Sequence, residues 1–297
     1  MSVKYPRTDL ACVANVELAH INGTEYKIED RDVCIVEHLD ILSYEASRKL
    51  SKNIGSYITV STPRVQYLDE RDAVKISKIL GEELRNLILK TVNKSNITRE
   101  LSVIVVGLGN QSITADAIGP AVADKICVTR HLLSRDSSLF DILGMCTVSA
   151  ISPGVLGKTG IESAETVKAA VDSIQPDIIL VIDALAARSV ERLARTFQIS
   201  NTGITPGEGI GNSRSELSIR TLVIPVISLG VPTVVHSSTL VFDALTNAGV
   251  YDTSETLVEI LNSVDSFFVT PKETDSITEK AVSILVNAIK SALVISP

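Results

Sequence analysis

The chain has 297 residues, of which 45% are hydrophobic, 21% are charged and only 4% are aromatic. This is the composition of a globular protein whose core is built from Val, Ile, Leu and Ala, since tryptophan is absent. The formal net charge of -7 argues against a nucleic-acid-binding protein, because such proteins present basic surfaces to phosphate groups.

The cysteines, the first residues and the apolar runs exclude further classes. Cys12, Cys34, Cys127 and Cys146 are scattered and form no CxxC pair, which disfavours a zinc site and favours reduced thiols. The start of the chain lacks the apolar core of a signal peptide. No apolar run approaches the roughly 20 residues that span a bilayer. We therefore expect a cytoplasmic protein without a metal site.

The apolar periodicity predicts strands and helices that alternate along the chain. Alternating or unbroken runs of apolar residues predict strands at 24–36, 56–60, 101–106, 146–151, 178–182, 223–229 and 267–270. Apolar residues that recur every three or four positions predict helices at 71–92, 119–132, 161–174, 189–196, 238–248, 254–263 and 275–293. This alternation predicts an α/β fold with a mostly parallel sheet covered by helices on both faces.

Two aspartates follow expected strands in positions where a parallel sheet collects its ligands. Asp116 lies shortly after the loop 107–110, and Asp183 begins the loop 183–188; a third such loop is 230–236. Each aspartate alone is compatible with a helix N-cap, which stabilises a helix by about 1 kcal/mol. Together they suggest a carboxylate pair that shares one proton and activates water, as in aspartic peptidases. The spacing leaves open whether the two are neighbours.

A glycine-rich segment suggests nucleotide binding instead. Residues 152–159 read SPGVLGKT and end like a phosphate-binding loop, with Lys158 as the phosphate ligand and Asp183 near magnesium. Ser152 replaces the first glycine of that motif, and Pro153 removes a backbone N–H from the loop. A P-loop-like nucleotide-dependent protein that uses Lys158 and Asp183 is therefore the main alternative from the motifs alone.

Seven segments spread over nearly the whole chain form a very specific combination. They are RTDLA (7–11), VVGLGNQSITADAIGP (105–120), SAISPGVLGKTGIES (149–163), LVIDALAARSVERL (180–193), QISNTGITPGEGIGNSR (198–214), IPVISLGVPTVV (224–235) and FFVTPKETD (267–275). In these segments and their order the chain resembles the germination protease family of endospore-forming bacteria. The resemblance implies an α/β/α sandwich similar to the hydrogenase-maturation peptidases.

The resemblance also implies an activity and its setting. The family comprises atypical aspartic endopeptidases that degrade small acid-soluble spore proteins during germination, in the cytoplasm of the forespore and spore core. It implies a homotetramer. We further expect no cofactor, no membrane contact and, from the net charge of -7, no direct contact with nucleic acid.

The family's two functional aspartates lie in motifs that match this chain at Asp116 and Asp183. The resemblance thus pairs two residues that sequence spacing could not pair. Glycine loops beside them could supply N–H groups to an oxyanion or bind substrate. The candidates for this role are Gly107, Gly109, Asn110, Gly230, Thr233 and His236.

The family is made as a zymogen that cleaves itself between an acidic and a hydrophobic residue. The matching bond in RTDLA is Asp9–Leu10, which makes residues 1–9 a propeptide and residues 10–297 a single peptidase domain. The family often has a glutamate two positions after RTDLA, but here residues 12–14 are Cys-Val-Ala. That departure bears on self-processing more than on catalysis.

Two more departures from the family keep further hypotheses open. Lys158 stands where an apolar residue is expected, and His236 stands where an aspartate is expected. If His236 joined Asp116 and Asp183 as a third ligand, the protein would be a metal-dependent peptidase like the hydrogenase-maturation enzymes. A relative that binds spore proteins without cutting them is disfavoured, because both aspartates are retained.

Overall fold

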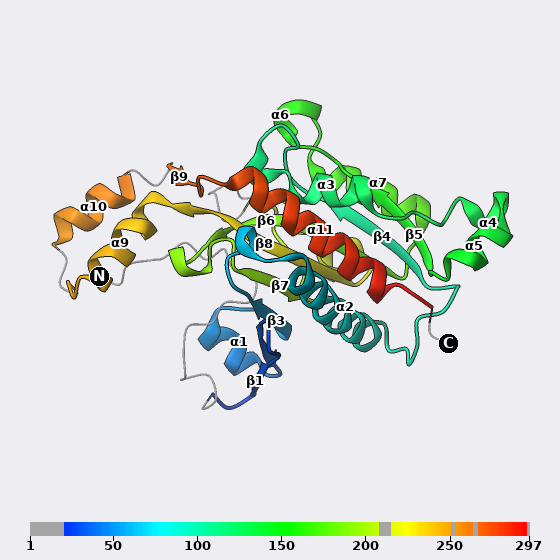
Figure 1. Ribbon diagram of the computed structural model, residues 1–297, viewed down its shortest axis with the longest axis horizontal. Coiled ribbons are helices and arrows are strands. Elements are labelled where there is room, and N and C mark those ends of the chain that lie inside the picture. Colours follow the sequence, from blue (N-terminus) through cyan, green and yellow to red (C-terminus); the bar gives the residue numbers. More distant parts are fainter. Residues whose placement is uncertain (1–20, 208–214, 251–253, 264–266, 296–297) are drawn as a thin grey trace.

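The computed structural model describes residues 21–207, 215–250, 254–263 and 267–295 (Figure 1). The expected cleavage bond Asp9–Leu10 and the departure at residues 12–14 lie outside the described residues, as does the whole expected propeptide 1–9.

Nine strands form one sheet within the described residues. They are β1 (Thr24–Asp30), β2 (Ile35–Ile41), β3 (Gly55–Ser61), β4 (Ser102–Gly107), β5 (Thr147–Ile151), β6 (Ile178–Ala187), β7 (Thr196–Ser200), β8 (Val226–His236) and β9 (Phe268–Val269). The order across the sheet is β1-β2-β3-β7-β8-β6-β4-β5, and β9 pairs with β8.

The sheet has a parallel centre and an antiparallel side. β8, β6, β4 and β5 pair in parallel, whereas β1, β2, β3 and β7 join one another and β8 in antiparallel pairs. The parallel strands carry the unbroken Val, Ile and Leu runs because both of their faces are buried. The expected α/β fold around a parallel sheet is confirmed.

Helices cover both faces of the sheet. One face is covered by α2 (Glu70–Val92), α3 (Ile118–Lys125) and α11 (Thr274–Ala292). The other face packs against α7 (Ser163–Ile174) and α8 (Ile219–Leu222). The remaining helices are α1 (Tyr44–Leu50), α4 (Leu132–Arg135), α5 (Ser137–Leu143), α6 (Leu156–Thr159), α9 (Ser237–Asn247) and α10 (Glu255–Ser263).

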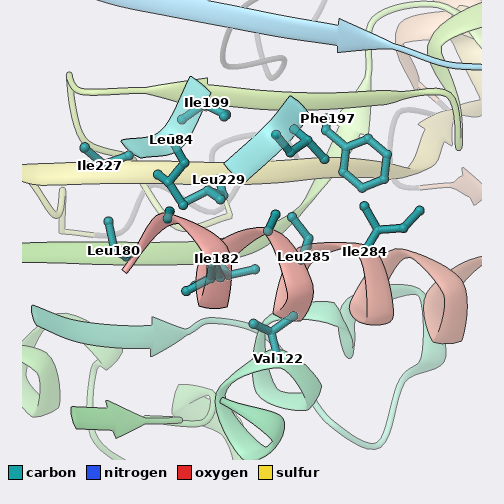
Figure 2. Close-up of a cluster of buried hydrophobic side chains, with 14 of the residues drawn as sticks. Leu84, Val122, Leu180, Ile182, Phe197, Ile199, Ile227, Leu229, Ile284 and Leu285 are labelled. Atoms are coloured by element: carbon teal, nitrogen blue, oxygen red, sulfur yellow. The ribbon is translucent and has the colours of Figure 1, made fainter. Parts of the chain in front are cut away.

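The alternation of side chains along β6 divides the core into two layers. Leu180 and Ile182 point toward α2, α3 and α11, while Ile179 and Val181 pack in the layer that contains α7. Figure 2 shows the first layer, in which strand residues meet Leu84, Val122, Ile284 and Leu285 of the helices. Burying one such side chain stabilises the fold by about 1.5–3 kcal/mol.

Several expected element boundaries are wrong, and three of the differences bear on the candidate site. The strand expected at 178–182 continues to Ala187, so Asp183 lies inside β6 rather than at its end. The expected loop 230–236 is the second half of β8, which pairs with the extension of β6. The helix expected at 189–196 is one 3₁₀ turn, Val190–Arg192, followed by β7. The apolar pattern does not mark these strands, because small or polar residues interrupt it. Alanines continue β6, and β7 buries Gln198 and Ser200.

A glycine in α3 sets how closely that helix approaches the sheet. A Cβ atom at Gly119 would lie 2.2 Å from the Leu108 carbonyl oxygen and 2.5 Å from that of Ile182. Both atoms are backbone and cannot turn aside. We expect Gly119→Ala to lower the free energy of unfolding by about 2 kcal/mol or more, measured by urea denaturation.

Gly157 in α6 provides the matched control, because a Cβ there meets no atom within 4 Å. Gly157→Ala should be neutral or slightly stabilising, since alanine favours helix by up to about 1 kcal/mol. Equal stability of the two variants would contradict the close contact at Gly119.

A buried carboxyl on α2 should give the stability of the fold a pH dependence. Glu83 is only 5% exposed, and burial raises the pKa of its carboxyl above the ordinary value of 4.5. His38 Nε2 and Arg31 Nη2, each 3.7 Å from a carboxylate oxygen of Glu83, oppose that shift. Between pH 4.5 and its raised pKa, the folded state holds more protons on Glu83 than the unfolded state does.

The free energy of unfolding should therefore fall as pH rises through this window, and Glu83→Gln should flatten that fall. Urea denaturation at several pH values measures both slopes. The control is Glu82→Gln, which changes an exposed neighbour on the same helix and should keep the wild-type slope. An unchanged slope in Glu83→Gln would show that Glu83 titrates alike in both states.

Candidate active site

Asp116 is held by a tight turn after β4. The chain passes Gly109, whose φ is +117°, and enters a short 3₁₀ helix, η3 (Thr114–Asp116). The backbone N–H of Asn110 donates to Asp116 Oδ2 at 2.7 Å. A Cβ on Gly109 would lie 2.1 Å from the Asp116 carbonyl oxygen. Only glycine allows the turn to fold back so closely on Asp116.

Asp183 is held by the sheet itself. It lies within β6, is 7% exposed, and stands opposite Gly230 in the pairing with β8. The backbone N–H of Ala184 donates to Asp183 Oδ1 at 2.9 Å. Strand alternation places Asp183 on the same face of the sheet as Val181 and Leu185. A carboxyl at so buried a position is costly, which favours a functional role.

One cavity of about 710 Å³ is lined by both aspartates. Asp116 reaches it from the turn after β4, and Asp183 reaches it from β6, the neighbouring parallel strand. Further walls come from the end of α1, from residues 202–205 with Gly207, and from β9 with Thr270. The cavity lies toward the carboxyl ends of β6 and β8, the end of the parallel strands at which the sequence predicted a site.

The cavity contains cationic side chains that were not among the predicted site residues. Lys52, Arg188 and Arg220 line it, together with Glu216. Arg220 Nη2 donates to both carboxylate oxygens of Glu216, at 2.9 and 2.8 Å. Lys52 Nζ lies 5.0 Å from the ring centroid of Tyr57, and burial raises the pKa of that tyrosine. Arg188 alone carried a signal, because it closes the motif that contains Asp183.

Thr233 is the single member of the proposed oxyanion set that lines this cavity among the described residues. Its hydroxyl donates to the Ala115 carbonyl oxygen at 2.6 Å. The other candidates, Gly107, Gly109, Asn110, Gly230 and His236, are not among the described lining residues. Gly107 packs against the backbone of Gly119, and Asn110 uses its N–H on Asp116.

His236 and Lys158 stand apart from the aspartates. His236 is buried at the end of β8, where its ring packs on Phe268 with centroids 4.4 Å apart. Lys158 is exposed on the one-turn helix α6, and its Nζ donates to Ser112 Oγ. Neither lines the cavity of Asp116 and Asp183. This arrangement gives no support to a phosphate site built from Lys158 and Asp183.

The described residues hold neither a group of metal-ligating side chains nor a helix that could span a membrane. No three His, Cys, Asp or Glu side chains in the described ranges come together in a way that could hold a metal ion. No helix within those ranges combines the length and apolar character needed to cross a membrane.

The fold and the shared cavity define an α/β protein with an aspartate-lined site beside its parallel strands, and comparison with known proteins gives its family. The family model for germination protease matches residues 9–248. The chain is 39% identical to the germination protease of Clostridium perfringens strain 13, over 97% of this chain and 94% of the relative. It is 39% identical to that of Clostridium acetobutylicum, over 90% and 86% of the two chains. The chain therefore belongs to the germination protease family, and its activity is that of a peptidase in spore germination.

Among solved structures, the chain is similar to a NiFe hydrogenase maturation protease from Thermococcus kodakarensis KOD1. The match covers 67% of this chain and 98% of that chain, with 16% sequence identity and a TM-score of 0.31.

Proposed function

We propose that this peptidase is an atypical aspartic endopeptidase that begins the degradation of small acid-soluble spore proteins, with Asp116 and Asp183 activating water. The observation that carries the proposal is the shared cavity, which Asp183 lines from β6 and Asp116 lines from the turn after the neighbouring strand β4. Family membership supports the protease activity, and the geometry supports the choice of residues.

The chemistry follows from two carboxyls in one partly desolvated cavity. Both cannot ionise easily, so they share one proton. The ionised carboxyl takes a proton from water, and the water oxygen attacks the carbonyl carbon of the scissile bond. The protonated carboxyl donates to the carbonyl oxygen as negative charge develops there. When the tetrahedral intermediate collapses, the C–N bond breaks and the nitrogen leaves with a proton.

The rest of the cavity suits a peptide of mixed character. Lys52 and Arg188 supply positive charge, while Leu50, Ile113 and Phe268 supply apolar surface. A substrate segment in which an acidic residue precedes an apolar one would find partners for both side chains. This supports cleavage at the kind of bond that the family resemblance implies.

The proposal extends to maturation and assembly. The chain is made as a zymogen in the forespore, cleaves itself at Asp9–Leu10, and acts as a homotetramer in the spore core. The RTDLA segment supports the cleavage bond, and the family resemblance supports the assembly. Residues 12–14 are Cys-Val-Ala, and we expect this chain to process itself more slowly than family members that have a glutamate two positions after RTDLA.

Replacing either aspartate by asparagine should abolish peptidase activity and keep the fold. The new amide side chain would keep an oxygen to accept from the Ala184 N–H, so Asp183→Asn removes the shared proton with little other change. We expect kcat for a purified small acid-soluble spore protein to fall by about 10⁴-fold or more, followed by mass spectrometry of the products. Asp116→Asn should lower kcat to a similar extent.

Lys158→Ala is the control, because Lys158 is exposed and lies outside the cavity. It should retain activity and show no altered binding of ATP or GTP with magnesium. Substantial activity in Asp183→Asn would sink the aspartate pair. Nucleotide binding that Lys158→Ala abolishes would instead favour the P-loop alternative.

Self-processing should be visible as a loss of mass. After the purified chain is shifted to mildly acidic pH, we expect the wild type to lose residues 1–9 and Asp183→Asn to remain intact, because the cut needs the same carboxyl pair. Intact-mass spectrometry over time measures this. An intact wild type that still cuts the spore protein would refute the Asp9–Leu10 assignment but leave the peptidase proposal standing.

A further inference from the structure

β8 carries one more residue than β6 along their shared ladder, and that residue is Thr233. Leu185 pairs with Pro232, and the next residue of β6, Ala186, pairs with Val234. The skipped residue forms a β-bulge. A bulge re-aims the side chain at its position and increases the local twist, and bulges are frequent beside active sites.

The re-aimed side chain reaches the turn that carries Asp116. Thr233 is 2% exposed, and its Oγ1 donates to the carbonyl oxygen of Ala115 at 2.6 Å. A second hydroxyl holds the same turn, because Thr278 Oγ1 of α11 donates to the Thr114 carbonyl oxygen at 3.1 Å. Two elements far apart in sequence thus hold η3 by its backbone.

These contacts matter because the two aspartates are supported differently. Asp183 lies inside a paired strand, so the sheet sets its position. Asp116 lies in a turn outside the sheet, and its place depends on what holds that turn. β8 contacts both the strand of Asp183 and the turn of Asp116. Its Gly230 pairs with Asp183, and its Thr233, three residues later, donates a hydrogen bond to Ala115 in the turn.

We propose that Thr233 is a positioning residue that, through the bulge in β8, sets the distance between the carboxyls of Asp116 and Asp183. The inference rests on the proposed function of that pair. Thr233 acts through Ala115 rather than on the substrate, because its hydroxyl proton is engaged by the Ala115 carbonyl oxygen. Two carboxyls share a proton only at a suitable separation, so a shifted Asp116 loses catalytic power.

The test replaces the hydroxyl and keeps the shape. Thr233→Val has the same volume and no donor, whereas Thr233→Ser restores the donor. With a purified small acid-soluble spore protein as substrate, we expect Thr233→Val to lower kcat by about 100-fold with KM unchanged, because the reacting groups are misplaced. Thr233→Ser should recover most of the loss. The pH–rate profile of Thr233→Val should also shift, since the apparent titration of a carboxyl pair depends on its separation.

A buried threonine elsewhere gives the matched control. Thr129 is fully buried, and its Oγ1 donates to the Cys146 carbonyl oxygen at 2.6 Å, outside the residues that line the cavity. Thr129→Val loses the same kind of bond. It should lower the midpoint of urea unfolding and leave kcat and the pH–rate profile as in the wild type.

The outcomes separate this inference from the function on which it rests. An unchanged kcat in Thr233→Val, or a loss that Thr233→Ser does not restore, overturns the positioning role even if both aspartate variants are inactive. Activity retained in Asp116→Asn and Asp183→Asn overturns the proposed function itself. If Thr233→Val does not fold, Thr233→Ala takes its place, since it fits the same space, lacks the donor and is judged by the same two results.

Discussion

The parallel pairing of β6 with β8 is the constraint on which the site depends. This ladder continues well past Asp183, from Ile179 with Val226 to Ala187 with Val235. Because it does so, a carboxyl is placed within a strand that is buried on both faces, and one residue of β8 is left over to reach the neighbouring turn. A ladder that stopped at Ile182 would leave Asp183 on a loop, where its position would be set less rigidly.

The same ladder explains how a carboxyl is accommodated among apolar layers. Asp183 follows Ile179 and Val181 in alternation, so it continues a face that is otherwise packed against α7. The apolar layer gives way to the cavity at this point, and the Ala184 N–H meets one carboxylate oxygen. β6 therefore serves both the core and the candidate site. Its first residues, such as Ile179 and Val181, pack in the core, whereas its residues 183–186 line the cavity.

Sequence patterns were sufficient for the α/β fold, and they singled out the two aspartates that line one cavity, because these features depend on local periodicity and on compact motifs. Sequence patterns failed where pairing between strands that are distant in the sequence determines the structure. The extension of β6 contains small alanines that resemble a loop, and β7 is a strand with buried Gln198 and Ser200. Lys52 and Tyr57 line the cavity from a part of the chain far from either aspartate motif, so no local signal marked them. The bulge at Thr233 is visible only once the register with β6 is known.

The failure of the phosphate-loop pattern shows why a motif needs its structural context. A phosphate loop works when its backbone N–H groups converge at the start of a long helix and its lysine reaches into the same site. Here the only helical structure within the motif is the single turn of α6, which contains Gly157 and ends at Gly160 with φ +71°. Lys158 extends to Ser112 on the loop that leads to η3. Asp183 lies on β6, which is two strands away in the sheet from β5, the strand that precedes α6. Most residues of the phosphate-loop motif are present, but they are not arranged so that they could bind a phosphate group together. Asp116 and Asp183, in contrast, line a common cavity.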